Sequence, residues 1–146
     1  MERIKRYLLP DTAGPMLTSS LLLAMRLIFG FLFLNHGISK WIAFESLALS
    51  FPDPIGVGST VSLLLCMFAE IICSIGFILG AAYRLSLVPM IIAMAVALFS
   101  VHSGDPITTK EPALIYLCIF CIMFLWGPGY FSIDSLLIRT NSKKRL

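Results

Sequence analysis

The residues LTSSLLLAMRLIFGFLFLNHGISK, 17–40, form an apolar run long enough to cross a lipid bilayer, with an arginine near its middle. An ionised guanidinium at that depth costs roughly 2.5–3.5 kcal/mol on insertion scales, so Arg26 requires a partner. At helical spacing, one face of the run carries Arg26, Gly30, Phe33, Gly37 and Lys40. We expect this face to pack against a second helix that supplies an acidic group.

The best candidate for that acid is Glu70, which lies about half way along the second apolar run. One helical face of this run holds Cys66, Glu70, Cys73, Phe77, Gly80 and Arg84. The spacing of Gly76 and Gly80 favours close approach of helices in a membrane. We therefore predict an intramembrane Arg26–Glu70 pair. One interpretation of this pair is a structural ion pair. The other is a functional site that binds an anionic or quinone-like ligand or takes part in proton movement.

The composition of the 146-residue chain is typical of a membrane protein. Hydrophobic residues make up 58% of the sequence and charged residues 13%, with a mean hydropathy of +0.93. A soluble domain has about 45–50% apolar and about 25% charged residues. The net charge of +3 is small and gathered at the two ends, which indicates a lipid bilayer as the partner and not nucleic acid. The four cysteines lie inside apolar runs, which argues against a secreted disulfide framework.

These patterns predict an all-α membrane protein, a four-transmembrane-helix bundle with spans at about 17–34, 59–82, 85–101 and 113–126. A basic lead at 1–16 precedes the membrane domain at 17–134, and a basic tail follows at 135–146. The first long connection is expected to begin with a short interfacial helix at 40–47 and to continue through a stretch broken by prolines. Because both ends and the Arg84 turn are basic, the positive-inside rule places both termini in the cytoplasm.

A second polar group is expected at the outer mouth of the bundle, where antiparallel helices end. It comprises His36, Lys40, His102, Lys110 and Glu111. Two histidines at one depth are compatible with haem or metal ligation, but we favour solvated helix ends and predict no metal site.

Cys118 and Cys121 form a CxxC pair in the fourth run. This spacing is a redox motif in thioredoxin-like proteins. Because no such context surrounds it here, we favour buried thiols that behave as small hydrophobic side chains over redox thiols.

The order of these motifs resembles the DoxX family of small four-helix bacterial membrane proteins. The matching elements are Arg26, HGISK (36–40), EII (70–72), Gly76, LG (79–80), Arg84, KE (110–111), Ala113, Tyr116 and GPGYFSID (127–134). The resemblance implies an integral protein of the bacterial inner membrane. Some members are similar to a subunit of a thiosulfate:quinone oxidoreductase, others are linked to oxidative-stress complexes, and many have no assigned activity. The family also resembles membrane proteins of methylamine dehydrogenase maturation, which keeps a thiol role for Cys118 and Cys121 open.

Our first hypothesis is a DoxX-like membrane subunit of a redox system that engages quinone or a partner oxidoreductase, and that is not an enzyme by itself. The sequence carries no strong cofactor motif, so quinone or a group on the partner protein would be the redox carrier. One alternative is a small-solute or proton transporter. Because four short helices leave little room for a transport pathway, this alternative requires a homo-oligomer. The other is a structural membrane anchor for a partner protein.

Overall fold

The structure is a computed structural model that describes residues 14–143, apart from the side chains of residues 141–143. In chain order the elements are α2 (Pro15–Ile42), α3 (Phe44–Leu47), α4 (Ser59–Met67), η1 (Phe68–Cys73), α5 (Ser74–Leu79), α6 (Tyr83–Val96), η2 (Ala97–Val101), α7 (Ile107–Trp126) and α8 (Ile133–Lys143). The two η segments are π-helical turns that continue α4 and α6. Most of the basic lead, 1–13, and the last three residues of the basic tail lie outside the described residues.

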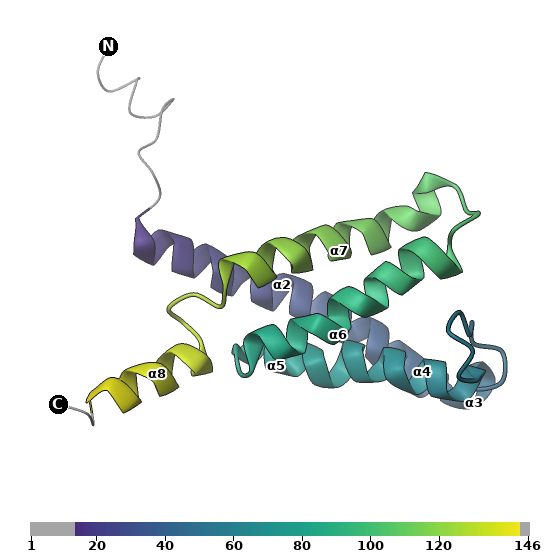
Figure 1. Cartoon of the computed structure of the whole chain (residues 1–146), viewed down its shortest axis with the longest axis horizontal. Coiled ribbons are helices and arrows are strands. Elements are labelled where there is room, and N and C mark those ends of the chain that lie inside the picture. The colour runs from purple at the N-terminus through teal and green to yellow at the C-terminus, as the bar shows by residue number, and fades with distance from the viewer. Residues whose placement is uncertain (1–13, 144–146) are drawn as a thin grey trace, which may run out of the picture.

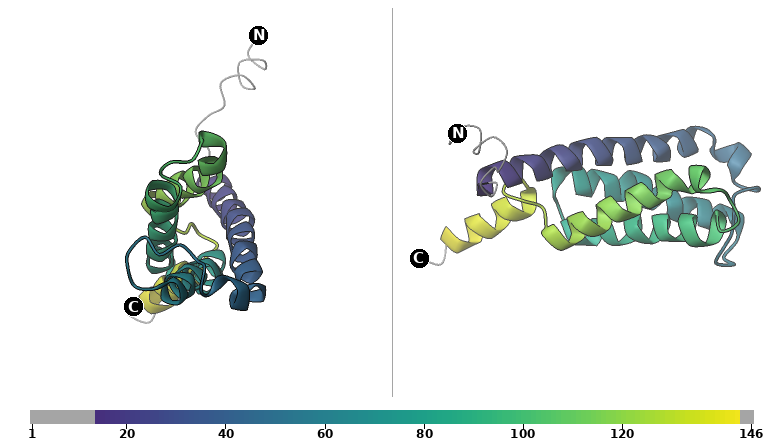
Figure 2. Two further views of the ribbon diagram at one scale, coloured as in Figure 1. Left: turned by 90° about the vertical axis from the view of Figure 1, so that its right-hand side faces the viewer. Right: turned by 90° about the horizontal axis from the view of Figure 1, so that it is seen from above.

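Four helical rods are long and apolar enough to cross a membrane: Pro15–Ile42, Ser59–Leu79, Tyr83–Val101 and Ile107–Trp126. They run alternately in opposite directions (Figure 1). The start of α2, the α5–α6 turn, the end of α7 and α8 lie at one end, here called the terminal end (Figure 2). The end of α2, α3, the start of α4 and the α6–α7 connection form the opposite, loop end. The predicted all-α class with four such helices is confirmed, and the chain is an integral membrane protein.

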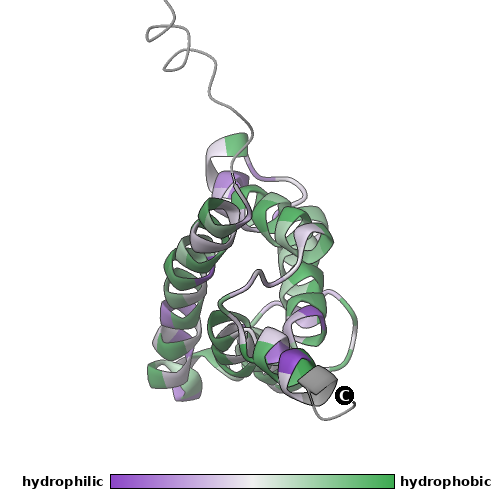
Figure 3. Ribbon diagram, turned by 90° about the vertical axis from the view of Figure 1, so that its left-hand side faces the viewer, coloured by the Kyte–Doolittle hydropathy of each residue, from purple (hydrophilic) through white to green (hydrophobic). Residues whose placement is uncertain are grey.

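The outside of the bundle is apolar along the four rods. Large hydrophobic side chains such as Leu21, Phe31, Ile72, Ile92 and Leu125 are exposed, and Figure 3 shows hydrophobic residues over most of the ribbon. In water such a surface would be unfavourable, whereas lipid chains are as apolar as these side chains.

Helix α2 is longer than its predicted span. It begins with Pro15 in the first turn, where a missing N–H costs nothing, and continues beyond Leu34 to Ile42. Asn35 and His36 do not end the helix because both side chains are exposed on its outer face. Its 28 residues correspond to about 42 Å of helix, so α2 must tilt or project beyond a ~30 Å hydrocarbon core.

The other helix boundaries also differ from the predicted ones. The second rod ends at Leu79, because Gly80 adopts the left-handed conformation (φ 67°) that terminates helices. Helix α7 begins at Ile107 and not near Ala113, directly after Pro106. Lys110 and Glu111 belong to its first turns and not to the preceding loop. The predicted short helix in the first connection corresponds to α3, with four residues.

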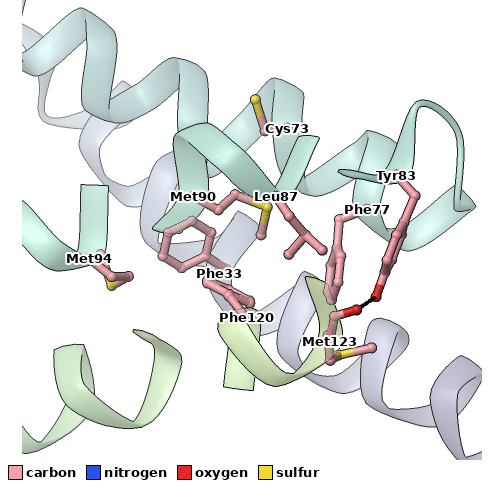
Figure 4. Packing of buried hydrophobic residues seen from close by; sticks show 9 residues of the cluster. All are labelled: Phe33, Cys73, Phe77, Tyr83, Leu87, Met90, Met94, Phe120 and Met123. Carbon is pink, nitrogen blue, oxygen red and sulfur yellow. Dashed lines mark hydrogen bonds between the residues drawn. The ribbon is translucent and has the colours of Figure 1, made fainter. Parts of the chain in front are cut away.

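The core lies where α2, α5, α6 and α7 meet (Figure 4). It consists of Phe33, Cys73, Phe77, Tyr83, Leu87, Met90, Met94, Phe120 and Met123. The rings of Phe77 and Tyr83 stack with centroids 5.6 Å apart, and the Tyr83 hydroxyl donates to the Met123 carbonyl at 3.2 Å. An aromatic layer therefore lies between the two ends of the bundle.

Candidate functional site

A buried ion pair occupies the loop end of the bundle. Lys40, in the last turn of α2, places its Nζ 2.8 Å from both carboxylate oxygens of Glu70. The Glu70 side chain is 4% exposed and that of Lys40 is 24% exposed. The carboxylate is thus enclosed by protein, while the ammonium keeps contact with the surroundings of the bundle.

Local backbone structure brings these two charges together. Glu70 lies in η1, and π-turns rotate the residues of a helix relative to a regular α-helix and are frequent at functional sites. On the facing helix, Gly37 leaves room for η1, since a Cβ at this position would lie 2.9 Å from the Glu70 Cβ. The close approach of α2 and η1 therefore depends on a residue without a side chain.

Two further polar side chains lie near Glu70, and a third contacts one of them. The half-buried Cys66 lies one turn earlier and is placed to donate a hydrogen bond to the carboxylate. Tyr116 of α7 lies within electrostatic range of Glu70. The exposed His36 ring packs edge-on against Tyr116, with centroids 5.9 Å apart. Groups from α2, α4, η1 and α7 thus form one polar cluster at this end.

An apolar cavity of about 360 Å³ lies beside this cluster. Its wall is formed by Phe51, Pro52, Pro54, Ile55, Ser62, Leu65, Cys66, Phe68, Pro89, Ile92, Ala93, Val96, Ala97 and Val101. Leu65, Phe68 and Ile92 are also exposed on the outside of the bundle, so the cavity opens towards the position of the lipid chains. Cys66 belongs both to the cavity wall and to the surroundings of Glu70.

The segment after Phe51 covers the cavity and is tied to α4 by Asp53. Its carboxylate accepts hydrogen bonds from the Ser62 hydroxyl at 2.7 Å and from the N–H groups of Gly58 and Val57 at 2.7 and 3.0 Å. The Ser62 hydroxyl foremost, and these amides with it, hold the pKa of Asp53 below its ordinary value. Asp53 thereby ties this segment to the start of α4 and fixes one wall of the cavity.

Arg26 lies at the opposite, terminal end and is 1% exposed. Its two terminal nitrogens donate to the carbonyl oxygens of Pro128 and Phe131 at 2.7 and 2.6 Å. A Cβ on Gly80 would lie 2.8 Å from the guanidinium, so this glycine makes the space. The arginine fastens the segment that follows α7 to the side of α2.

Asp134, at the start of α8, holds the segment that follows α7 through a second set of hydrogen bonds. Its carboxylate oxygens accept from the backbone N–H groups of Ala82 and Tyr83, both at 2.9 Å, and its own N–H donates to the Gly80 carbonyl at 3.0 Å. Asp134 therefore caps the start of α6, and its negative charge lies within electrostatic range of Arg26.

The predicted Arg26–Glu70 pair is wrong. Glu70 packs beside Gly37, which is 11 residues beyond Arg26 on α2, or about 16 Å of helix. The prediction placed both residues half way along their spans, but α2 extends past its expected end and shifts that register. The predicted face of α2 is confirmed, because Arg26, Gly30, Phe33 and Gly37 are its buried residues.

The predicted outer-mouth residues do not form one cluster. Lys40 binds Glu70, whereas His102 contacts Asp105 at 2.7 Å and Lys110 donates to the Ser103 carbonyl at 2.6 Å. Glu111 is exposed in the first part of α7. These residues lie at the loop end, but only His36 and Lys40 reach the surroundings of Glu70.

The cysteine pair is placed differently from the expectation. Cys118 and Cys121 are free and exposed on α7, so they are not the buried thiols that we favoured. Within residues 14–143, no group of three or more His, Cys, Asp or Glu side chains is arranged to hold a metal ion.

Sequence reasoning missed the acceptors of Arg26 and the cavity. Carbonyl acceptors carry no sequence signal, since every residue has one, but GPG at 127–129 does indicate exposed, irregular backbone that could meet a buried donor. The role of Lys40 was readable, because it shares the face of Gly37 and falls one turn beyond it.

Comparison with known proteins identifies the family of the chain. A sequence model of the DoxX family matches residues 21–103, which include both Arg26 and the Lys40–Glu70 pair. Neither the curated proteins nor the solved structures provide a match. The match covers more than half of the chain and confirms the resemblance noted in its motifs: the protein belongs to the DoxX family.

Proposed function

We propose that the chain is a membrane subunit of a quinone-linked redox system, and that the loop-end cavity receives the quinone beside Glu70. One observation carries this proposal: an apolar cavity open towards lipid shares the Cys66 wall with a buried, ion-paired carboxylate. Ionisable groups inside a membrane are functional candidates by default, and the cavity volume of about 360 Å³ falls in the usual range for ligand sites.

The chemistry of a quinone fits these surroundings. Its ring and isoprenoid tail are apolar, and its two carbonyl oxygens accept hydrogen bonds. In an otherwise apolar lining the wall holds the Ser62 hydroxyl, which already donates to Asp53, and the Cys66 thiol, which would turn from Glu70 to donate to a quinone carbonyl. Reduction of a quinone to a quinol takes up two electrons and two protons. Glu70 and Lys40 would exchange protons with the loop-end surface, whereas the electrons would come from a redox partner protein.

The arrangement of charges favours this function over transport by a single chain. The buried charged groups of the described residues, Arg26 and the Lys40–Glu70 pair, lie towards opposite ends of the bundle, with the layer of Phe33, Phe77, Tyr83 and Phe120 between them. Continuous polar pathways mark transporters and proton channels. A structural anchor is the second candidate, and the Arg26 clamp favours it, since both hydrogen bonds of its guanidinium hold the segment that follows α7.

We further propose that the protein resides in a bacterial inner membrane with the terminal end in the cytoplasm. Arg84 lies at this end, and the sequence adds Arg3, Lys5 and Arg6 before α2 and Lys143 to Arg145 at the tail. The loop end carries charges of both signs. Fusions of a fluorescent protein and of alkaline phosphatase to the C-terminus test this orientation, since only the first would be active under the proposal.

The ligand proposal is tested by native mass spectrometry and lipid extraction of the purified, folded protein. We expect a quinone to co-purify with the wild type and to be lost from Ala93→Phe, which fills the cavity, and from Glu70→Gln. Leu85→Phe on the same helix is the matched control, because Leu85 is 74% exposed and outside the cavity wall. Absence of quinone from the wild type, with a partner protein retained in all variants, would overturn the proposal in favour of the anchor.

A further inference from the structure

Helix α8 (Ile133–Lys143) projects from the terminal end of the bundle, away from the four rods (Figures 1 and 2). Its first turn is fastened by Asp134 to the α5–α6 turn and by the Ser135 hydroxyl, which donates to the Gly129 carbonyl at 2.7 Å. These bonds orient the helix but cover little of it.

The side of α8 turned away from these anchors is apolar and exposed. Ile133, Leu136 and Leu137 fall on one face at helical spacing, and Leu136 and Leu137 are each 59% exposed. Nothing among the described residues covers this face. Exposed Trp126, Tyr130 and Phe131 lie just before the helix, and aromatic side chains of this kind gather at membrane–water interfaces.

The charge that α8 can present to a ligand is positive. Arg139 is half-buried, stacks over the Tyr130 ring with its guanidinium carbon 3.3 Å from the centroid, and donates to the Tyr130 carbonyl at 3.4 Å. This is its one hydrogen bond within the described part of the chain, so other N–H donors of the guanidinium remain for a phosphate. The only acid of α8 is Asp134, and both of its oxygens already accept backbone N–H groups.

The order of residues along the helix matches the layers of a bilayer surface. The leucines lie in the half next to the bundle, whereas Arg139 and Lys143 lie in the half further from it. A helix that leaves the hydrocarbon region in this direction would place its basic residues at the level of the headgroups.

We propose that α8 is an interfacial helix that binds the anionic headgroups of membrane lipids, with Leu136 and Leu137 in the acyl region and Arg139, pre-oriented by Tyr130, on the lipid phosphate. The occupant is an anionic phospholipid and not a protein, because basic residues follow the exposed apolar side chains Leu136, Leu137 and Ile138 and interfacial aromatic residues precede them. This inference is independent of any ligand at the loop end.

The test titrates the full-length protein in detergent with phosphatidylglycerol or phosphatidylcholine and follows bound lipid by native mass spectrometry. We expect phosphatidylglycerol to bind more tightly, and Arg139→Gln to weaken it about fivefold, the effect of one basic residue near an anionic surface. Lys110→Gln is the matched control, since it removes the same charge at the loop end and should leave this affinity unchanged. The double variant Leu136→Ser/Leu137→Ser should weaken both lipids.

Equal affinity for the two lipids would overturn the proposal, as would equal losses in Arg139→Gln and Lys110→Gln. Specific dimers of the protein that dissociate in Leu136→Ser/Leu137→Ser, without any effect of lipid charge, would also overturn it and assign the face to a second copy of the chain.

Discussion

Each end of the bundle buries a charge in a membrane-spanning helix, but the two charges are stabilised in different ways. At the terminal end, Arg26 has no direct ion pair among the described residues and instead donates to two backbone carbonyls. At the loop end, Glu70 has a full counter-charge in Lys40 and lies beside an open cavity. The first arrangement fixes a segment of chain in place, whereas the second leaves groups that can respond to a ligand. Burial of a charge alone therefore does not identify a functional site.

Removal of the Arg26 guanidinium should have the largest effect. Arg26→Met leaves the carbonyls of Pro128 and Phe131 buried without donors and releases the segment before α8. Two charge-assisted hydrogen bonds of about 1.5–3 kcal/mol each predict a loss of about 3–6 kcal/mol in the free energy of unfolding. SDS titration of the protein in mixed micelles measures it. Arg84→Gln at the same end is the control, and an equal loss there would contradict the clamp.

Breaking the Lys40–Glu70 ion pair should lower the free energy of unfolding by less. The loss should also differ between substitutions of the two residues. In Glu70→Gln the surviving Lys40 is partly exposed and can reach the loop-end surface, so we expect a loss of about 1–2 kcal/mol. In Lys40→Met the enclosed Glu70 carboxylate keeps no counter-charge, and about 3 kcal/mol should be lost. The same SDS titration ranks the two variants, and the reverse order would show that Glu70 is better hydrated than its burial indicates.

Two glycine substitutions at the loop end test how closely α2 packs against η1. Gly37→Ala forces α2 away from η1, because its Cβ would lie 2.6 Å from the Ile71 side chain and 3.1 Å from the Glu70 carbonyl carbon. Such overpacking costs about 1–3 kcal/mol and should also reduce ligand retention in the cavity. Gly104→Ala, with nothing within 4 Å of its Cβ, should change neither quantity. A Gly37→Ala protein with full stability would show that the helices are not held so closely.

The smallest effect is expected from Asp53 and depends on pH. Because its pKa is lowered in the folded protein, its contribution to stability is complete above the ordinary pKa of about 3.9 and is lost as pH falls below that value through the folded pKa. Ligand retention in the cavity should therefore be constant from pH 7 to pH 5 and decrease only in stronger acid. Asp53→Asn should remove this acid-dependent step, and a step that persists in the variant would assign it to another group.

Much of the fold could be predicted from hydropathy and helical spacing. The four apolar runs and the buried face with Arg26, Gly30, Phe33 and Gly37 follow from periodicity alone. The partner of each buried charge could not be predicted in this way. The depth of each charged residue in the membrane was counted from the predicted helix ends, and α2 continues eight residues past the expected Leu34. A π-turn, a carbonyl acceptor and a cavity under an irregular loop depend on tertiary packing and leave no periodic signal.

Charge reversal tests the central assignment most directly. If Glu70 pairs with Lys40, the double variant Lys40→Glu/Glu70→Lys should recover at least half of the stability that each single reversal loses. Arg26→Glu/Glu70→Arg should recover nothing, because these positions are separated by about 16 Å of helix and an aromatic core. The measurement is the free energy of unfolding in mixed micelles for the four single and two double variants. Recovery in the Arg26 double variant, and none in the Lys40 double variant, would contradict the account.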